Sequence, residues 1–150
     1  MTPLFVDYES FAGLVDDLLV QIADVAFDAV AGIDALGFVL GTTIAIRTQK
    51  PFIAIRKEGK LPGPRISAQF VDYTGKQKGL EMRPDAVRPG NAVLVVDEWI
   101  ETGAQVRAAA QLIEQQGGTV VAIATINLDA NETTRPLKEK YRIISVTNDF

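Results

Sequence analysis

The stretch that most constrains the fold is residues 92–118, AVLVVDEWIETGAQVRAAAQLIEQQGG. It begins with Ala92–Val96, an apolar and mostly β-branched run that is typical of a central parallel strand covered on both faces. Asp97 and Glu98 follow at its carboxyl end, which is where open α/β sheets bind their ligands. From Thr102–Gln105 onward the pattern predicts an amphipathic helix, and a pair of glycines ends it. The apolar residues of that helix share one broad face: Val106, Ala109, Ala110, Leu112 and Ile113.

This junction of strand and helix has the properties of a phosphate-binding site. The N-terminus of a helix presents unpaired N–H groups and the positive end of the helix dipole to an anion. Gly103 lets the backbone approach the anion closely, and Thr102 can donate its hydroxyl. Two carboxylates just upstream would repel phosphate unless they bind a divalent cation or sugar hydroxyls. The junction therefore predicts a sugar phosphate bound with Mg²⁺. The alternative is that the acidic residues only solvate the loop and cap the helix.

Composition excludes several kinds of chemistry. The chain has 150 residues, enough for one domain, and contains neither cysteine nor histidine. Disulfides, cysteine nucleophiles, histidine triads and most zinc sites are thereby excluded, so acid–base catalysis falls to Asp, Glu, Lys, Tyr or water. The sequence shows no signal peptide and no membrane-spanning run, so we expect a cytoplasmic protein without a membrane partner. The net charge of −4 argues against a broad nucleic-acid-binding surface.

Helical and strand patterns alternate along the rest of the chain. The repeated β-α-β order predicts a parallel sheet with right-handed crossovers. The polar tip TGKQKG, between two strand-like runs, indicates a mobile β-ribbon. Helices are predicted at Ser10–Asp24, Gly37–Thr48 and Thr133–Tyr141, and strands at Phe27–Ile33, Pro51–Ile55, Ile66–Tyr73, Leu80–Met82, Thr119–Leu128 and Ile143–Val146. The small and apolar residues of Gly37–Thr48 suit a helix that packs tightly on a sheet.

A second chemical cluster is the basic loop RKEGKLPG at residues 56–63. Three cations, Arg56, Lys57 and Lys60, follow the end of a predicted strand. Arginine can hold two phosphate oxygens at once, and lysine supplies a point charge. A basic loop alone is usually a solvated surface. Its position at the same sheet edge as the acid pair and the helix N-terminus favours binding of phosphate groups instead.

Together these segments resemble a known family. GIDALGFVLG (32–41), PFIAIRKEGKLPG (51–63), VDYTGKQKGLEMRPDAVRPG (71–90) and AVLVVDEWIETGAQ (92–105) are similar to the type I phosphoribosyltransferases, adenine phosphoribosyltransferase-like branch. The resemblance implies a single α/β domain with a mostly parallel central sheet flanked by helices, a flexible β-ribbon lid, and a small hood from the N-terminal leader and residues 128–141. It also implies transfer of ribose 5-phosphate from phosphoribosyl pyrophosphate to a purine base, with Mg²⁺, in a homodimer.

The resemblance assigns roles to the residues that would hold phosphoribosyl pyrophosphate. Asp97 and Glu98 match the acidic pair that holds the ribose hydroxyls, directly or through metal-bound water. The loop around the 5′-phosphate matches Glu101, Thr102, Gly103, Ala104 and Gln105. The pyrophosphate-binding segments match Asp34 and Ala35, which in the family are often joined by a cis peptide, and Arg56, Lys57 and Lys60, which act in part across a dimer interface.

Two carboxylates are candidates for catalysis. The segment from Asp72 to Gly79 resembles the lid that closes over the reacting centre, and Asp72 is the nearest counterpart of a glutamate that lies near the base. Glu101 stands where 6-oxopurine enzymes have an aspartate that acts on the purine. We predict that Glu101 contacts the base or assists its deprotonation. The alternative is that it only caps the following helix.

The base itself is predicted to lie among apolar residues at the rim of the crevice. Candidates are Phe5 and Val6 on the leader, Trp99 and Ile100 beside the acid pair, and Leu128 with Asp129 after the late strand. The resemblance favours Phe5 and Leu128, whose family counterparts line the base pocket, and Val6 is predicted to bind the base with them. The alternative is that each of these side chains is an ordinary core residue. The chain departs from the family pattern at Val6, Leu36, Ala104 and Gln105. These differences keep a second function open, that of a regulatory relative which binds phosphoribosyl pyrophosphate or a nucleotide with little turnover.

Overall fold

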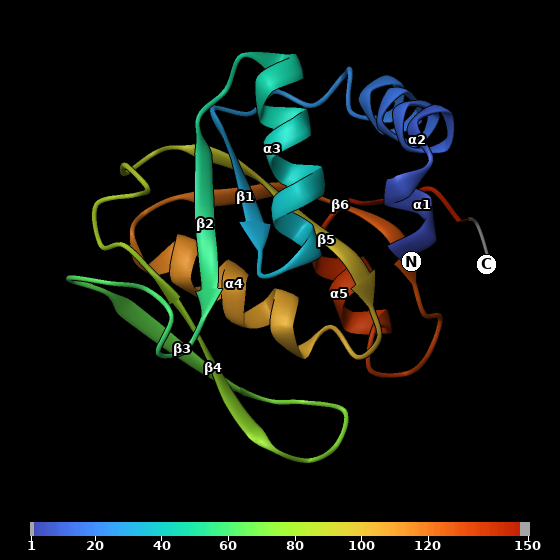
Figure 1. Cartoon of the computed structure of the whole chain (residues 1–150). Coiled ribbons are helices and arrows are strands. Elements are labelled where there is room, and N and C mark those ends of the chain that lie inside the picture. Colours follow the sequence, from blue (N-terminus) through green and yellow to red (C-terminus); the bar gives the residue numbers. More distant parts are fainter. Residues whose placement is uncertain (1, 148–150) are drawn as a thin grey trace.

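The computed structural model describes residues 2–147, in which one seven-stranded sheet lies between two layers of helices (Figure 1). The strand order is β3-β4-β2-β1-β5-β6-β7. The strands are β1 (Ala29–Ile33), β2 (Phe52–Lys57), β3 (Ile66–Val71), β4 (Gln77–Met82), β5 (Ala92–Ile100), β6 (Thr119–Leu128) and β7 (Ile143–Ser145). The helices are α1 (Thr2–Val6), α2 (Tyr8–Gln21), α3 (Leu36–Thr48), α4 (Ala104–Gln115) and α5 (Arg135–Lys140).

The central strand is β5, which pairs in parallel with β1 on one side and β6 on the other. Its side chains alternate between two cores. Val93 and Val95 pack in the core on the α4 side, whereas Leu94 and Val96 pack against α2 and α3. Each buried side chain of this kind contributes roughly 1.5–3 kcal/mol relative to an exposed one. The prediction of a central parallel strand covered on both faces is confirmed.

Helix α3 lies unusually close to the sheet, because glycines stand where the two backbones meet. A Cβ added at Gly37 would come within 2.7 Å of the Val96 carbonyl oxygen, and one at Gly41 within 2.8 Å of the Phe52 ring. The small residues therefore allow the first turn of α3 to approach the end of β5. The predicted close packing of this helix on the sheet is confirmed, and it brings the start of α3 next to Asp97.

Some boundaries differ from the prediction. Strand β5 does not end at Val96 but continues to Ile100, since Asp97 and Trp99 keep pairing with β6. Helix α4 consequently begins at Ala104 rather than at Thr102. The remaining elements differ from the prediction by a few residues at their ends, apart from β6, which matches it.

The N-terminal leader forms a helix that the sequence pattern did not predict. Helix α1 has only five residues, too few for a helical period to be recognised. Helix α2 follows at once, because the Asp7 side chain caps it by accepting a hydrogen bond from the Ser10 N–H at 3.0 Å. None of the helices within residues 2–147 combines the length and apolarity needed to cross a lipid bilayer.

The topology defines where a ligand can bind. The chain passes from β1 to β2 in one direction along the sheet and from β5 to β6 in the other, so the order reverses between β1 and β5. In open α/β sheets, ligands bind beyond the carboxyl ends of the strands at such a reversal. The loops that follow β1, β2 and β5 meet at this edge, and the β3–β4 ribbon stands beside them (Figure 1).

Candidate active site

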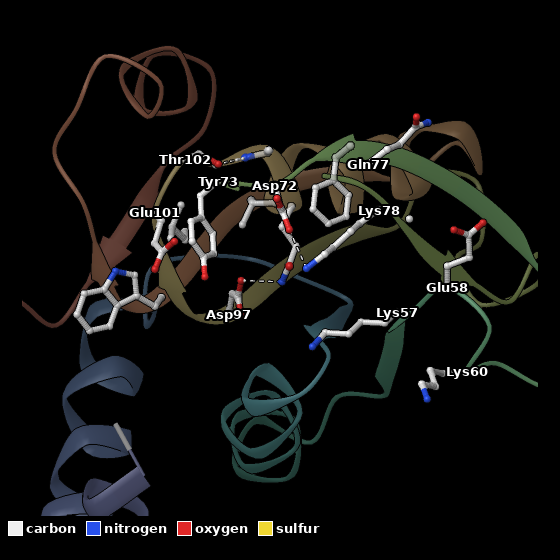
Figure 2. Close-up of a pocket in the computed structure, with 18 residues that line it drawn as sticks. Lys57, Glu58, Lys60, Asp72, Tyr73, Gln77, Lys78, Asp97, Glu101 and Thr102 are labelled. Atoms are coloured by element: carbon white, nitrogen blue, oxygen red, sulfur yellow. Dashed lines mark hydrogen bonds and ion pairs between the residues drawn. The ribbon is translucent and has the colours of Figure 1, made fainter. Parts of the chain in front are cut away.

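A cavity of about 550 Å³ opens at this edge of the sheet (Figure 2). Its walls come from four segments: the end of β2 with the basic loop, the β3–β4 ribbon, the end of β5, and the first turn of α4. The residues that carry its chemistry are Lys57, Glu58, Lys60, Asp72, Tyr73, Lys78, Asp97, Trp99, Glu101, Thr102, Gly103, Ala104 and Gln105. Most of the predicted site residues are thus brought together by the fold.

Asp97 and Glu98 lie in different environments. Asp97 is only 6% exposed, and its carboxylate accepts hydrogen bonds from the Glu98 N–H at 2.9 Å and the Gln105 side-chain amide at 3.4 Å. Burial, with a smaller contribution from the Glu98 charge, raises the pKa of Asp97 to about 7. Burial also raises the pKa of Glu98, whose Oε2 atom is buried without a hydrogen-bond partner. Burial therefore opposes ionisation of both carboxylates, and Oε2 of Glu98 has no hydrogen-bond partner to offset that cost.

The predicted phosphate loop lies at the N-terminus of α4. Gly103 adopts a positive φ of 77°, which turns the chain into the helix, and no side chain caps this end. The Thr102 hydroxyl oxygen accepts a hydrogen bond from the Ala104 N–H at 3.3 Å. Because the N-cap is a glycine and the Thr102 hydroxyl engages only the Ala104 N–H, the following N–H groups of the first turn are available to an anion. Gln105 connects this loop to the acid pair through its bond to Asp97.

Arg56 and Asp34 join the loops around the cavity and do not line it themselves. The Asp34–Ala35 peptide is cis, and neither residue lines the cavity. The Asp34 carboxylate accepts a hydrogen bond from the Lys57 N–H at 3.4 Å and lies 3.7 Å from the Arg56 Nε. Arg56 also donates to the Lys60 carbonyl at 2.8 Å. These contacts join the loops after β1 and β2, and they leave the ammonium groups of Lys57 and Lys60 at the cavity.

The tip of the β3–β4 ribbon is organised by Asp72. One of its oxygens accepts hydrogen bonds from the Thr74 N–H at 2.8 Å, the Thr74 hydroxyl at 2.6 Å and the Lys76 N–H at 3.1 Å. The other lies 2.7 Å from the Lys78 ammonium. The hydrogen bonds from Lys78 and Thr74 hold the pKa of Asp72 well below its usual range. Asp72 is therefore an ionised group engaged by its own ribbon.

The environment of Glu101 differs from that of Asp72. Its side chain is exposed and lines the cavity, as does that of Tyr73 (Figure 2). Its carbonyl accepts a hydrogen bond from the Asn131 side chain at 2.8 Å, but its carboxylate makes no hydrogen bond or ion pair with any described residue. Because α4 has Gly103 at its N-cap and no side-chain cap bond, Glu101 does not cap the helix.

The apolar candidates for the base separate into two groups. Trp99 and Ile100 line the cavity, whereas Phe5, Val6 and Leu128 do not. Phe5 packs edge-on against Phe11, Val6 is exposed, and Leu128 belongs to the core on the α4 side. Trp99 is 44% exposed, and its indole N–H donates to the Asp129 carboxylate at 3.0 Å, which fixes the ring at the rim.

Sequence reasoning missed two residues that support the loops. Arg107 donates to the carbonyls of Thr133 at 3.1 Å and Thr102 at 3.3 Å, joining the loop before α4 to the segment before α5. Glu81, only 1% exposed, accepts hydrogen bonds from the N–H groups of Lys60 and Leu61 at 3.2 and 3.0 Å. Neither contact leaves a sequence signal, since each depends on how distant loops pack.

The buried Glu81 fixes the shape of the basic loop. Burial opposes its ionisation, but the backbone N–H groups of Leu61, Gly59 and Lys60, together with the Arg65 charge, keep the pKa of Glu81 below its usual value. Arg65 Nε lies 3.1 Å from the carboxylate. Glu81 is therefore an ionised clamp that joins β4 to the loop carrying the cavity lysines.

A mostly parallel sheet that carries an acid pair, a helix N-terminus and lysines at the carboxyl ends of its strands suits a phosphorylated sugar, and family comparison agrees with this interpretation. Residues 7–150 match the family described as phosphoribosyl transferase domain. The chain belongs to the type I phosphoribosyltransferases. Within this family its relatives are adenine phosphoribosyltransferases, which identifies the branch.

Three relatives illustrate the similarity. An adenine phosphoribosyltransferase of Dinoroseobacter shibae is 44% identical over 83% of this chain and 69% of the relative. One of Agathobacter rectalis is 34% identical over 99% of this chain and 84% of the relative. The crystal structure of the adenine phosphoribosyltransferase from Thermoanaerobacter pseudethanolicus superposes with a TM-score of 0.90 at 33% identity, covering 97% of this chain and 84% of that one. The predicted fold class and family are thereby confirmed, and the chain is a phosphoribosyltransferase.

Proposed function

We propose that this enzyme transfers the 5-phosphoribosyl group of phosphoribosyl pyrophosphate to adenine or a related purine, releasing pyrophosphate, as a step of purine salvage. The observation that carries the proposal is the cavity that joins Asp97 of the acid pair, the N-terminus of α4 and the lysines after β2, with Glu98 next to Asp97 in the chain but outside the lining. The choice of adenine rests on the relatives, which are adenine phosphoribosyltransferases.

Each part of the sugar donor matches a different group of residues around the cavity. The N–H groups at the start of α4 and the Thr102–Gln105 loop suit the 5′-phosphate. Asp97 and Glu98 suit the ribose hydroxyls, because both carboxylates have acceptor capacity that the protein leaves unused. Lys57 and Lys60 suit the pyrophosphate, because hydrogen bonds to Asp34 and from Arg56 fix their backbones beside the loop of Asp34 and Ala35.

The transfer needs an acceptor for one proton. A ring nitrogen of the base forms a bond to the anomeric carbon of the ribose, and the bond from that carbon to pyrophosphate breaks with its electron pair. The nitrogen then loses its proton to a carboxylate. Of the two predicted candidates, Glu101 is the better supported, because its carboxylate is unpaired among the described residues while Asp72 is held by Lys78 and Thr74. A carboxylate with no partner can both orient the base and accept its proton.

The residues present fit a divalent cation. The buried and unpartnered Oε2 of Glu98, next to the buried Asp97, is a carboxylate oxygen of the kind that Mg²⁺ prefers. No group of three or more acidic side chains within residues 2–147 forms a complete metal cage, so Asp97 and Glu98 would hold the ion through water together with the substrate. Bound there, the ion would neutralise charge on the pyrophosphate.

For the base, the exposed aromatic rings at the rim offer the best support. Trp99 and Tyr73 line the cavity from two different segments, and each presents a flat apolar face on which a purine can stack. Phe5, Val6 and Leu128, carried over from the family, remain predictions that require a rearrangement of the leader and of the end of β6. The cytoplasmic location likewise remains a prediction from the sequence.

A panel of nucleobases tests the proposal. The full chain would be mixed with phosphoribosyl pyrophosphate, Mg²⁺ and adenine, hypoxanthine, guanine, xanthine or uracil, and release of pyrophosphate measured. We expect release with adenine above all. The alternative function, a regulatory relative, predicts tight binding of phosphoribosyl pyrophosphate with no release in any mixture, and that result would replace the proposal.

The proposed role of Glu101 has its own test. Glu101→Gln keeps the shape and removes the proton acceptor, so kcat/KM for the base is expected to fall about a hundredfold. Glu132→Gln is the matched control, because Glu132 is exposed and lies outside the cavity. Equal rates for the two variants would remove Glu101 from the mechanism.

We further propose a homodimer, as the resemblance implies for the basic loop. The outer face of α3 exposes Ile46 and part of Val39, which are apolar side chains without a covering element. Light scattering at micromolar concentration gives the mass in solution. If the protein is monomeric and still active, the active site is not shared between two subunits.

A further inference from the structure

Lys78 is a cation of the cavity to which the family resemblance assigned no role. It is the second residue of β4, and the residues that follow it, Gly79–Met82, are buried in the sheet. Its backbone is thereby anchored, while its side chain remains about half exposed at the wall of the cavity. Figure 2 shows the side chain extending from the ribbon into the space that Lys57 and Asp97 also face.

The Lys78 ammonium is held by a single carboxylate of the same ribbon. It lies 2.7 Å from Oδ2 of Asp72, whose other oxygen serves the turn through Thr74 and Lys76. The Asp72 contact raises the pKa of Lys78, so its ammonium stays charged while paired. The turn keeps its own hydrogen bonds on the other oxygen, so the ammonium can leave without dismantling the turn.

The charge of the cavity explains why this matters. Its walls carry the carboxylates of Glu58, Asp72, Asp97 and Glu101 against the ammonium groups of Lys57, Lys60 and Lys78. A diphosphate entering such a cavity is repelled unless cations turn toward it. Lysine is suited to this exchange, because its charge sits at the end of a flexible four-carbon chain.

We propose that Lys78 is a diphosphate-binding residue, whose ammonium is held by Asp72 in the free enzyme and transfers to the pyrophosphate group of the sugar donor on binding. The proposal rests on the proposed function, because it requires that the cavity bind phosphoribosyl pyrophosphate. On this proposal, Asp72 and the pyrophosphate compete for the Lys78 ammonium. Asp72, which the family resemblance placed near the purine base, is in the free enzyme the counter-ion of Lys78.

The test is calorimetric titration of the full chain with inorganic pyrophosphate and Mg²⁺. Lys78→Met removes the proposed ligand, and Lys76→Met is its matched control, since Lys76 carries the same charge on the same ribbon but lies outside the cavity. We expect K78M to weaken pyrophosphate binding about tenfold and K76M to leave it within about twofold of the wild type. Ribose 5-phosphate, which lacks the diphosphate, is expected to bind K78M as it binds the wild type.

The competition with Asp72 gives a second readout. Asp72→Asn releases the ammonium, so it should tighten pyrophosphate binding in the wild-type background more than in the K78M background, where only the loss of repulsion acts. Equal weakening by K78M and K76M, or equal effects of D72N in both backgrounds, would overturn the proposal while leaving the proposed function intact. A wild-type enzyme that binds neither pyrophosphate nor the sugar donor would overturn both.

Discussion

Replacing Asp97 by asparagine is expected to make the free protein more stable at neutral and basic pH, although it removes a residue of the site. Asp97 is 6% exposed and its pKa is raised from 3.8 to about 7, mainly by burial. Its neighbours act in both directions, since the Glu98 charge raises the pKa and Lys57 lowers it. A carboxyl group with a raised pKa binds its proton more tightly in the folded than in the unfolded chain. Stability conferred at low pH is therefore lost as the pH rises from about 4 to 7.

The magnitude follows from the pKa. A tenfold change in an equilibrium constant is worth about 1.4 kcal/mol, so ionising Asp97 in the folded protein costs on the order of 4 kcal/mol relative to the unfolded chain, whose ordinary value is 3.8. Asparagine carries no charge and keeps an acceptor for the Glu98 N–H. It loses the bond from the Gln105 amide, a cost of about 1 kcal/mol that does not depend on pH.

The assay is urea unfolding of wild type and Asp97→Asn, with a chelator present and no substrate, at pH 4.5 and pH 8. The difference in the free energy of unfolding should shift in favour of the variant by about 3 kcal/mol between the two pH values. The control is Asp24→Asn, because the Arg142 side chain lowers the pKa of the exposed Asp24 below 3.8, so the contribution of Asp24 changes below about pH 4 and stays nearly constant between the two pH values. A difference between wild type and Asp97→Asn that is the same at both pH values would refute the reasoning.

The remaining predictions concern the clamp, the base and the phosphate loop. Glu81→Ala leaves the N–H groups of Lys60 and Leu61 without their acceptor and should lower the free energy of unfolding by about 3 kcal/mol. Urea titration measures this change, and an unchanged urea midpoint would show that Glu81 does not clamp the loop. Trp99→Ala should raise the KM for adenine about tenfold in initial-rate assays without changing that for the sugar donor, and a uniform change in both would assign Trp99 to folding alone. Gly103→Ala places a side chain at a φ of 77°, with its Cβ 3.0 Å from the Arg107 guanidinium, and should cost about 1–2 kcal/mol of stability and weaken ribose 5-phosphate binding; calorimetry that finds full affinity would contradict the assigned cradle.

The pH behaviour of Asp97 connects stability to function. The site keeps two carboxylates whose ionisation burial opposes, and one of them, Glu98, has a buried oxygen with no partner. A donor that brings hydroxyl groups and a cation supplies those partners, so part of the binding energy comes from relieving a cost already present in the folded chain. The free enzyme is predicted to gain more stability from the sugar donor with Mg²⁺ at pH 8 than at pH 5.

The fold and the main walls of the site could be predicted because they depend on local patterns. A continuous apolar run predicted the central strand, and the glycines and small residues of α3 predicted a helix that packs closely on the sheet. The end of β5 was misplaced because acidic residues usually mark a loop. Here Asp97 remains paired with Thr125 of β6, and an interaction between distant strands overrides the local preference.

Features that depend on register could not be predicted. Whether Lys78 faces the cavity is decided by the pairing of β3 with β4, in which Phe70 lies opposite Lys78 and Val71 opposite Gln77. A slip of one residue would turn Lys78 to the other face of the ribbon and bring Gln77 or Gly79 into its place. The sequence carries the lysine and the aspartate at either end of a polar tip, but only the folded ribbon places their charges together. For this reason the sequence singled out Asp72 of the ribbon as a catalytic candidate, whereas the importance of Lys78 emerged only from the structure.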